Sequence, residues 1–279
     1  MNTLFAHGLR RNLTKLSGAL ALTSLVAAAN AAVTFSGSSG SLAASAEFQV
    51  VNLLGVDYLE IRLTNTSAAD TVDPADLLTG VFFTLSGASN VLTNQGGQTG
   101  VFLEGSTVTI NGTTPGPTGG GNVGGEFAFV SGLTTNLLPG PSDPNIYYGV
   151  SSSGLGLFGP GDVFSSGSNL DGPGDPNGMN YGITSTGDNP ATKNPGQYSS
   201  VPLINDSVLI TLMEANAFDL ATLDLNTIGN VTFQYGTGLD EPRFTSTITA
   251  IPETSSTLTL GGVLLAGAFM RVRRRKLTK

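Results

Sequence analysis

The chain has no cysteine and no tryptophan, and its single histidine, His7, lies close to the N-terminus. Without cysteine the protein cannot form disulfides, even in an oxidising compartment. Because no thiol or imidazole base lies beyond residue 7, Ser–His and Cys–His nucleophilic catalysis are excluded in the rest of the chain. Zinc and other soft metals also lack their usual ligands there. These missing residue types exclude more functions than any motif in the sequence suggests.

Basic residues are scarce between positions 32 and 250. Nine of the 12 lysines and arginines lie outside that stretch, whereas 19 of the 20 acidic residues lie inside it. Three basic against 19 acidic residues give this body a net charge of −16, compared with −8 for the whole chain. Such a charge repels phosphate backbones and so excludes nucleic-acid binding. Cations, basic proteins and neutral glycans are the expected kinds of partner.

The N-terminus has the three parts of a secretory signal peptide. Arg10, Arg11 and Lys15 form a basic region, residues 16–29 form an apolar region, and Ala29 and Ala31 form a cleavage site of the A-x-A type. This order predicts a signal peptide over residues 1–31, with the mature chain beginning at the next residue.

The C-terminus carries a tripeptide, an apolar run and a basic cluster, in that order. The tripeptide is Pro252-Glu253-Thr254. The apolar run contains Leu258, Leu260, Val263, Leu264, Leu265, Phe269 and Met270, and the basic cluster is Arg271, Arg273, Arg274, Arg275 and Lys276. As a helix the run would span about 20 Å, less than the ~30 Å hydrocarbon core of a bilayer. The basic cluster follows the positive-inside rule. The pattern therefore indicates a short apolar helix held in the membrane transiently.

This tail resembles the PEP-CTERM sorting signal of exosortase-dependent bacterial surface proteins. The resemblance covers residues 251–279, with threonine at position 254 where the commonest form has proline. It implies an exosortase-type processing enzyme as partner, a transient stay in the inner membrane, and delivery to the cell surface or extracellular matrix. The chain then divides into a signal peptide (1–31), an extracellular domain (32–250) and a sorting segment (251–279).

The body reads as short β-rich runs between turn-forming residues, without helical periodicity. Residues 43–51 and 56–64 are the clearest strands, joined by a hairpin turn. In the second, Leu59, Ile61 and Leu63 alternate with Glu60 and Arg62, which is typical of a half-buried strand. Further strands are expected at 80–85, 107–110, 126–130, 207–213, 230–235 and 245–251. The pattern predicts an all-β fold, a single antiparallel β-sandwich or jelly-roll-like domain, flanked by the two terminal helices.

Two stretches do not read as ordinary hairpin loops. Residues 111–125 and 137–197 are rich in glycine, proline, aspartate and asparagine, and they are predicted to be long loops. Near the start of the body, Asp73 followed by Pro74 predicts a helical turn with an aspartate N-cap.

Calcium is the one ligand chemistry that this composition supports. Ca²⁺ takes six to eight oxygen ligands, and Asp171, Asp175 and Asn177 offer side-chain oxygens among flexible residues. Their spacing does not match an EF-hand. Aspartate and asparagine in such loops also bond to their own backbone, and the turn interpretation is the favoured one.

Three functions remain open. The favoured hypothesis is a structural or adhesive surface protein without catalysis, which makes multivalent contacts with extracellular polysaccharide. The alternative is a carbohydrate-binding, lectin-like module, calcium-dependent if the 137–197 loop binds the ion. An acid/base glycoside hydrolase ranks third. It would need two carboxylates at a set separation in a cleft, and the chain has no tryptophan for the aromatic platforms that are usual in such clefts.

Overall fold

The computed structural model describes residues 32–53, 55–86, 91–93, 101–102, 108–110, 121–123, 126–133, 147–155, 179–192, 202–246 and 251–252. Strands dominate these residues, which confirms the all-β fold class. The helical elements with defined bounds are 3-10 turns of three residues: η1 (Pro74–Asp76), η5 (Pro190–Thr192), η6 (Leu220–Thr222) and η7 (Leu225–Thr227). The predicted signal helix and C-terminal apolar helix lie outside the described residues.

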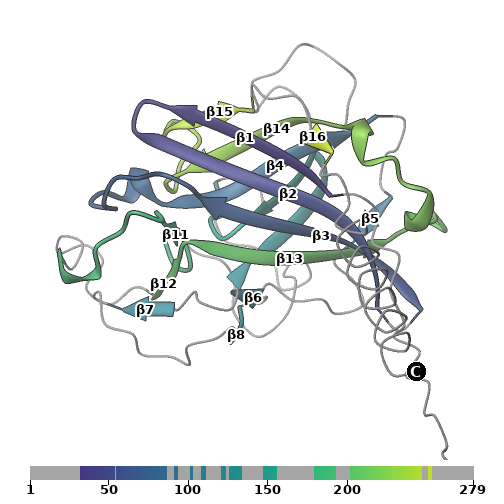
Figure 1. Ribbon diagram of the computed structural model, residues 1–279, viewed down its shortest axis with the longest axis horizontal. Coiled ribbons are helices and arrows are strands. Elements are labelled where there is room, and N and C mark those ends of the chain that lie inside the picture. The colour runs from purple at the N-terminus through teal and green to yellow at the C-terminus, as the bar shows by residue number, and fades with distance from the viewer. Residues whose placement is uncertain are drawn as a thin grey trace, which may run out of the picture.

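The strands form two sheets (Figure 1). In sheet A the order is β16 (Ile251–Pro252), β1 (Val33–Ser39), β2 (Leu42–Leu53), β3 (Val56–Asn65), β13 (Ser207–Glu214), β6 (Val101–Phe102) and β8 (Gly121–Asn122), with β5 (Leu92–Thr93) also paired to β13. In sheet B the order is β15 (Arg243–Thr245), β14 (Ile228–Tyr235), β4 (Leu78–Leu85), β11 (Ile183–Thr184), β12 (Pro202–Asn205) and β7 (Val108–Ile110). Two further strands, β10 (Tyr147–Ser151) and β9 (Ala128–Leu133), extend sheet B from β4.

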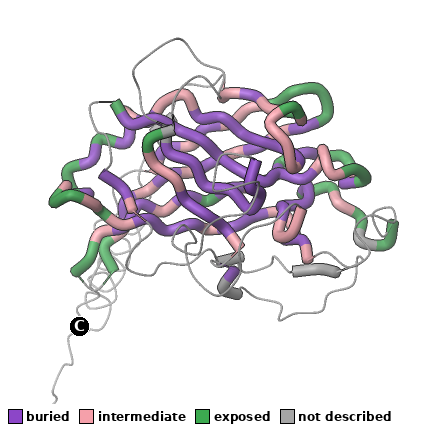
Figure 2. The backbone as a smooth tube through the Cα atoms, turned by 180° about the vertical axis from the view of Figure 1, so that it is seen from behind, coloured by how far each residue is buried: buried purple, intermediate pink, exposed green. Residues whose placement is uncertain are grey.

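The core lies between the two sheets. Residues along β2 alternate between buried and half-buried, as a strand with one face inward requires. Phe48 of β2 meets Phe83 of β4 edge to face, with ring centroids 5.1 Å apart, and Phe83 stacks on Tyr148 at 5.5 Å. Buried residues run along the strands and exposed ones gather at the turns (Figure 2). The two layers share one hydrophobic core, so the predicted β-sandwich is confirmed.

One pairing among the described strands departs from the predicted antiparallel arrangement. β11 and β12 run parallel, with Ile183 opposite Ile204. Parallel neighbours need a crossover of a dozen or more residues, which the long connection between these strands supplies. The other described pairings are antiparallel, so sheet B is mixed and sheet A is antiparallel.

The prediction of one long loop over residues 137–197 is wrong in part. β10 and β11 lie within this stretch, and both pair with β4 in sheet B. Tyr148 and Val150 are fully buried, so burial of a short aromatic and β-branched pair outweighs the turn-forming residues around it.

The predicted strand over residues 245–251 is also wrong, because the chain changes sheets there. β15 ends at Thr245 in sheet B, whereas β16 begins at Ile251 in sheet A. Near the crossing point, the Ser246 Oγ donates to the Ser36 carbonyl at 2.9 Å. The last strand of the body thus joins the sheet that contains the first.

The loop predicted over residues 111–125 is also wrong in part, because β8 lies within it and pairs with β6. Two other sequence predictions are confirmed. The hairpin formed by β2 and β3 spans the two strands expected at 43–51 and 56–64. Asp73 caps η1: its side chain accepts from the Ala75 N–H at 3.1 Å, and the Asp76 carboxylate accepts from the Asp73 N–H at 3.0 Å. This capping box fixes the segment that leads into β4.

Candidate functional site

The structure describes one residue of the expected sorting tripeptide. Pro252 lies in β16 opposite Val33, and Ile251 lies opposite Thr34. Glu253, Thr254, the apolar residues of 258–270, the basic residues of 271–276, and the cleavage-site residues Ala29 and Ala31 lie outside the described residues. Among the described residues, no helix is both long enough and apolar enough to cross a membrane.

The β1–β16 pair places both ends of the body at one edge of sheet A. Paired strands are about 4.8 Å apart, so the backbone of Pro252 runs directly beside that of Val33. The Val33 side chain is buried in the core. Proline has no N–H to donate to a ladder, and it is tolerated because β16 is the outermost strand. The last strand of the body, β16, is therefore paired with its first strand, β1.

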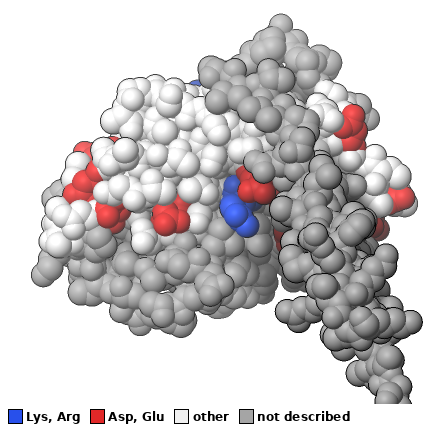
Figure 3. Space-filling view, viewed as in Figure 1, with Lys and Arg blue, Asp and Glu red and all other residues white. Residues whose placement is uncertain are grey.

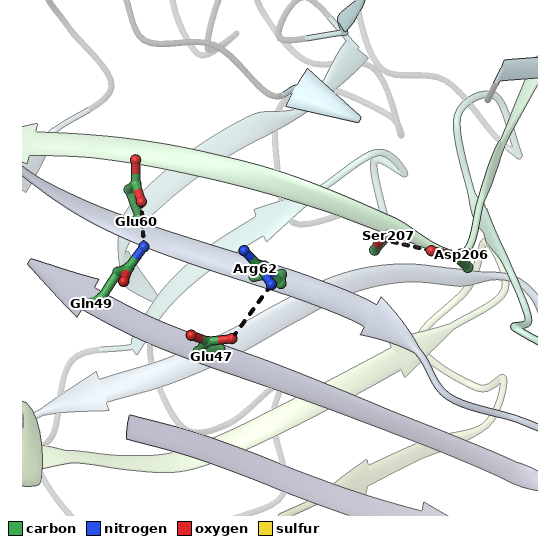
Figure 4. A network of polar contacts seen from close by, with 6 residues as sticks. All are labelled: Glu47, Gln49, Glu60, Arg62, Asp206 and Ser207. Carbon is green, nitrogen blue, oxygen red and sulfur yellow. Dashed lines mark hydrogen bonds and ion pairs between the residues drawn. The ribbon is translucent and has the colours of Figure 1, made fainter. Parts of the chain in front are cut away.

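A second feature is the outer face of sheet A, where polar residues of β2 and β3 lie opposite one another (Figure 4). Glu47 pairs in register with Arg62, and Gln49 with Glu60. The Gln49 Nε2 donates to the Glu60 Oε2 at 2.6 Å, and the Arg62 Nη1 lies 3.9 Å from the Glu47 Oε2. We call these four residues the polar ladder.

Hydroxyl side chains extend the polar ladder along the same face. Ser45, in β2, is opposite Ser36 on one side and Thr64 on the other. Thr64 is in turn opposite Ser207 of β13, whose Oγ donates to the Asp206 carboxylate at 2.7 Å (Figure 4). In these rows Ser36, Ser45 and Thr64 are half-buried, whereas Ser207 is buried.

The ion pair of the polar ladder is exposed. The Arg62 and Glu47 side chains are 48% and 32% accessible, so water screens their attraction and the pair contributes little stability. Acidic side chains outnumber basic ones over the face shown in Figure 3, which agrees with the composition of the body. Of the four residues of the polar ladder, Arg62 is exposed and the other three are half-buried.

The third feature is a cluster of polar side chains that is buried between the two sheets and has a structural role. The Tyr235 hydroxyl donates to the Ala43 carbonyl at 2.9 Å, and the Ser67 Oγ donates to the Asn65 Oδ1 at 2.7 Å. The Asn65 Nδ2 donates to the carbonyls of Asp76 and Ile183 at 3.1 and 2.9 Å. Burial raises the pKa of Tyr235 well above its ordinary value. We call Tyr235, Asn65 and Ser67 the buried polar cluster.

Backbone amides beside this cluster are held by two aspartates. Asp70 accepts from the Asn189 N–H at 2.8 Å, and Asp188 accepts from the Thr71 N–H at 3.3 Å. Burial acts to raise the pKa of Asp70, but hydrogen bonds, that from Asn189 first, lower it overall. These contacts pin residues 185–189, part of the predicted long loop, to the segment that follows β3.

The alternation in β3 predicted that Glu60 and Arg62 lie on the face away from the core. It did not predict that Glu47 and Gln49 of β2 lie opposite them. The alternation of β2 is the signal that could have placed these two residues. The weak calcium candidates Asp171, Asp175 and Asn177 lie outside the described residues. Within the described part of the chain, no three histidine, cysteine, aspartate or glutamate residues gather closely enough to hold a metal ion.

Comparison with protein-family models and with curated proteins finds no match for this chain.

Proposed function

We propose that this protein is an exported surface or extracellular-matrix protein with a structural or adhesive role and no catalysis. The signal peptide directs export, the C-terminal segment holds the chain briefly in the inner membrane, and an exosortase-type enzyme then processes it at Pro252-Glu253-Thr254. The acidic β-sandwich is the part that remains outside the cell.

The pairing of β1 with β16 is the observation that carries this proposal. Val33 follows the expected signal cleavage site, and Pro252 opens the expected sorting tripeptide; these two residues are partners in one sheet. A body whose two ends meet at one edge leaves the remainder of both sheets free to face away from the membrane. Termini that lie close together at the surface of a domain suit attachment at one point.

Mass spectrometry of the protein released by the producing cells tests the proposal. We expect termini near Ala32 and Glu253, with the released protein outside the cell. In a matched variant, alanine replaces Pro252, Glu253 and Thr254, and the chain should keep its tail and stay with the membrane fraction. Recovery of the intact chain from the cytoplasm alone would contradict the proposal.

Carbohydrate binding is the second candidate, and the polar ladder favours it. Carboxylate, amide and guanidinium groups in neighbouring register rows match the donors and acceptors of sugar hydroxyls. A glycan array, run with and without a chelator, would separate this function from a purely structural one. Binding that is lost in Gln49→Ala and kept in the exposed control Val72→Ala would support a lectin-like role for this face.

A further inference from the structure

The turn between β2 and β3 carries two exposed apolar side chains. Among the described residues, three large apolar side chains are exposed, and two of them, Leu53 and Val56, are register partners at the end of this hairpin. We call Leu53 and Val56 the hairpin tip. Apolar residues scattered singly over a surface need no partner, but a pair gathered at one turn forms a small contact surface.

Polar contacts fix the shape of this turn. The Asn52 Oδ1 accepts from the Gly55 N–H at 3.1 Å, and the Asn52 Nδ2 donates to the Asp57 Oδ1 at 2.7 Å. Gly55 has a φ of +89°, in the left-handed region that favours glycine. Since these contacts already order the backbone, the hairpin tip has little conformational entropy left to lose when it binds.

The hairpin tip projects past β1 at the end of sheet A where the body begins and ends (Figure 1). β1 starts at Val33, opposite Phe48, whereas β2 continues for five more residues, to Leu53. At ~3.4 Å per residue this overhang is about 17 Å. β16 runs in the same direction as β2, because both are antiparallel to β1. The chain therefore leaves Pro252 in the direction in which the hairpin tip projects.

The overhang matches the length of chain that leads to the expected apolar run. The run begins at Leu258, six residues after Pro252. Six residues of fully extended chain span at most about 21 Å, compared with the overhang of about 17 Å. A bilayer that takes up the apolar run is therefore within reach of the hairpin tip.

We propose that the hairpin tip rests on the lipid surface while the C-terminal segment holds the chain in the membrane. The inference rests on the proposed function, since the stay in the membrane is what brings the tip to the bilayer. Transfer of apolar side chains from water to the lipid interface is favourable. The strongly acidic body and Asp57 beside the tip repel anionic lipid, so the partner is a surface of neutral headgroups. Contact at both the tail and the tip fixes the orientation of the body, which a single attachment would leave free.

The chain has no tryptophan, so one introduced tryptophan reports its own surroundings. In the full chain, Leu53→Trp places this probe at the hairpin tip and Val72→Trp is the matched control. Leu53 is 49% accessible and Val72 is 48% accessible. The Val72 N–H donates to the Asp76 carboxylate, and the Asp76 carbonyl accepts from Asn65, the last residue of β3. The control thus lies at the opposite end of β3 from the hairpin tip.

The test reconstitutes both variants into phosphatidylcholine vesicles, with and without bromine on the acyl chains, and compares the fluorescence. We expect brominated lipid to quench most of the emission of Leu53→Trp and to leave that of Val72→Trp unchanged. Val56→Asn, added to Leu53→Trp, should reduce the quenching because it removes half of the apolar pair. Equal emission of Leu53→Trp in both kinds of vesicle would overturn the inference, as would equal quenching of the two single variants.

Flotation of the vesicles separates failure of this inference from failure of the proposed function. If the chain floats with the vesicles but Leu53→Trp is not quenched, the stay in the membrane stands and the inference fails. A shift of that emission to shorter wavelength without quenching would mean that protein, such as a second copy, covers the tip, and would also overturn it. A chain that does not float overturns both the inference and the membrane step. If quenching occurs as expected but cells do not process the chain, the contact of the tip with lipid stands and the proposed sorting fails.

Discussion

The Tyr235 hydroxyl donates a hydrogen bond to the Ala43 carbonyl at 2.9 Å, across 192 positions of the sequence. It links β14 of sheet B to β2 of sheet A. Tyr235→Phe removes this donor and leaves the Ala43 carbonyl with one partner fewer inside the protein. We expect a loss of about 1–3 kcal/mol in the free energy of unfolding, measured by urea denaturation. Tyr181→Phe, which removes the same atom from a half-buried ring outside the buried polar cluster, should cost less.

The same tyrosine predicts a loss of stability in alkaline solution. In the unfolded chain its hydroxyl ionises near its ordinary pKa of 10.0, whereas burial raises the pKa in the folded protein. The unfolded state therefore loses this proton first, and stability falls as the pH rises above 10.0. Urea midpoints measured from pH 8 upward should decline less steeply in Tyr235→Phe than in the parent. If the urea midpoints of the two proteins decline equally with pH, ionisation of Tyr235 is not the cause of the loss of stability.

Glu126 predicts a pH dependence of the same sign in the acidic range. Burial raises the pKa of this half-buried carboxyl above its ordinary 4.5, so its charged form disfavours the fold at neutral pH. Its contribution to stability improves as the pH falls through the raised value. Glu126→Gln should therefore raise the urea midpoint at pH 7, and the gain should vanish below pH 4.5.

The control for that experiment is Glu214→Gln. It removes the same charge from the acidic body at an exposed position of β13. A gain in the Glu126 variant that the control reproduces would mean that net charge, and not burial, is responsible.

Gly187 predicts a steric effect. A Cβ at this position would overlap the Ala68 carbonyl oxygen, a backbone atom that can move only with its segment. We expect Gly187→Ala to lower the free energy of unfolding by about 1–3 kcal/mol. At Gly229 the nearest atom, the Thr84 Oγ1, would be 3.4 Å from a Cβ, so Gly229→Ala is the matched control and should have little effect. Thermal denaturation of both variants provides the comparison.

The parts of the fold that were predicted from sequence depend on neighbouring residues. The alternation of Leu59, Ile61 and Leu63 with polar residues is a local pattern, and it predicts β3 and its buried face. The cap at Asp73 is also local, since its partner Asp76 is three residues away. Both were correct for that reason.

The parts that were missed depend on partners far away in the sequence. Nothing near Tyr148 marks it as a core residue, because glycine and serine follow it and the strands that bury it, β4 and β9, come from other regions. Asn65 is the last residue of β3, and the structure places its Oδ1 3.1 Å from the Tyr235 hydroxyl, 170 positions away. Such contacts exist only once both sheets have formed.

The candidate site divides in the same way. The order of tripeptide, apolar run and basic cluster is visible in the sequence because it is a linear pattern. The position of Pro252 beside Val33 is not, since it requires the chain to change sheets after β15. The sequence predicts the order of these segments, and the fold determines which strand lies beside Pro252.

The proline at the edge of sheet A also bears on how copies of this protein behave at high concentration. An outermost strand with free N–H groups is a template on which another chain can add a strand, which leads to fibres or aggregates. β16 is two residues long, and one of them, Pro252, has no N–H to offer. Even in a concentrated solution, copies of this protein are therefore not expected to join edge to edge through β16.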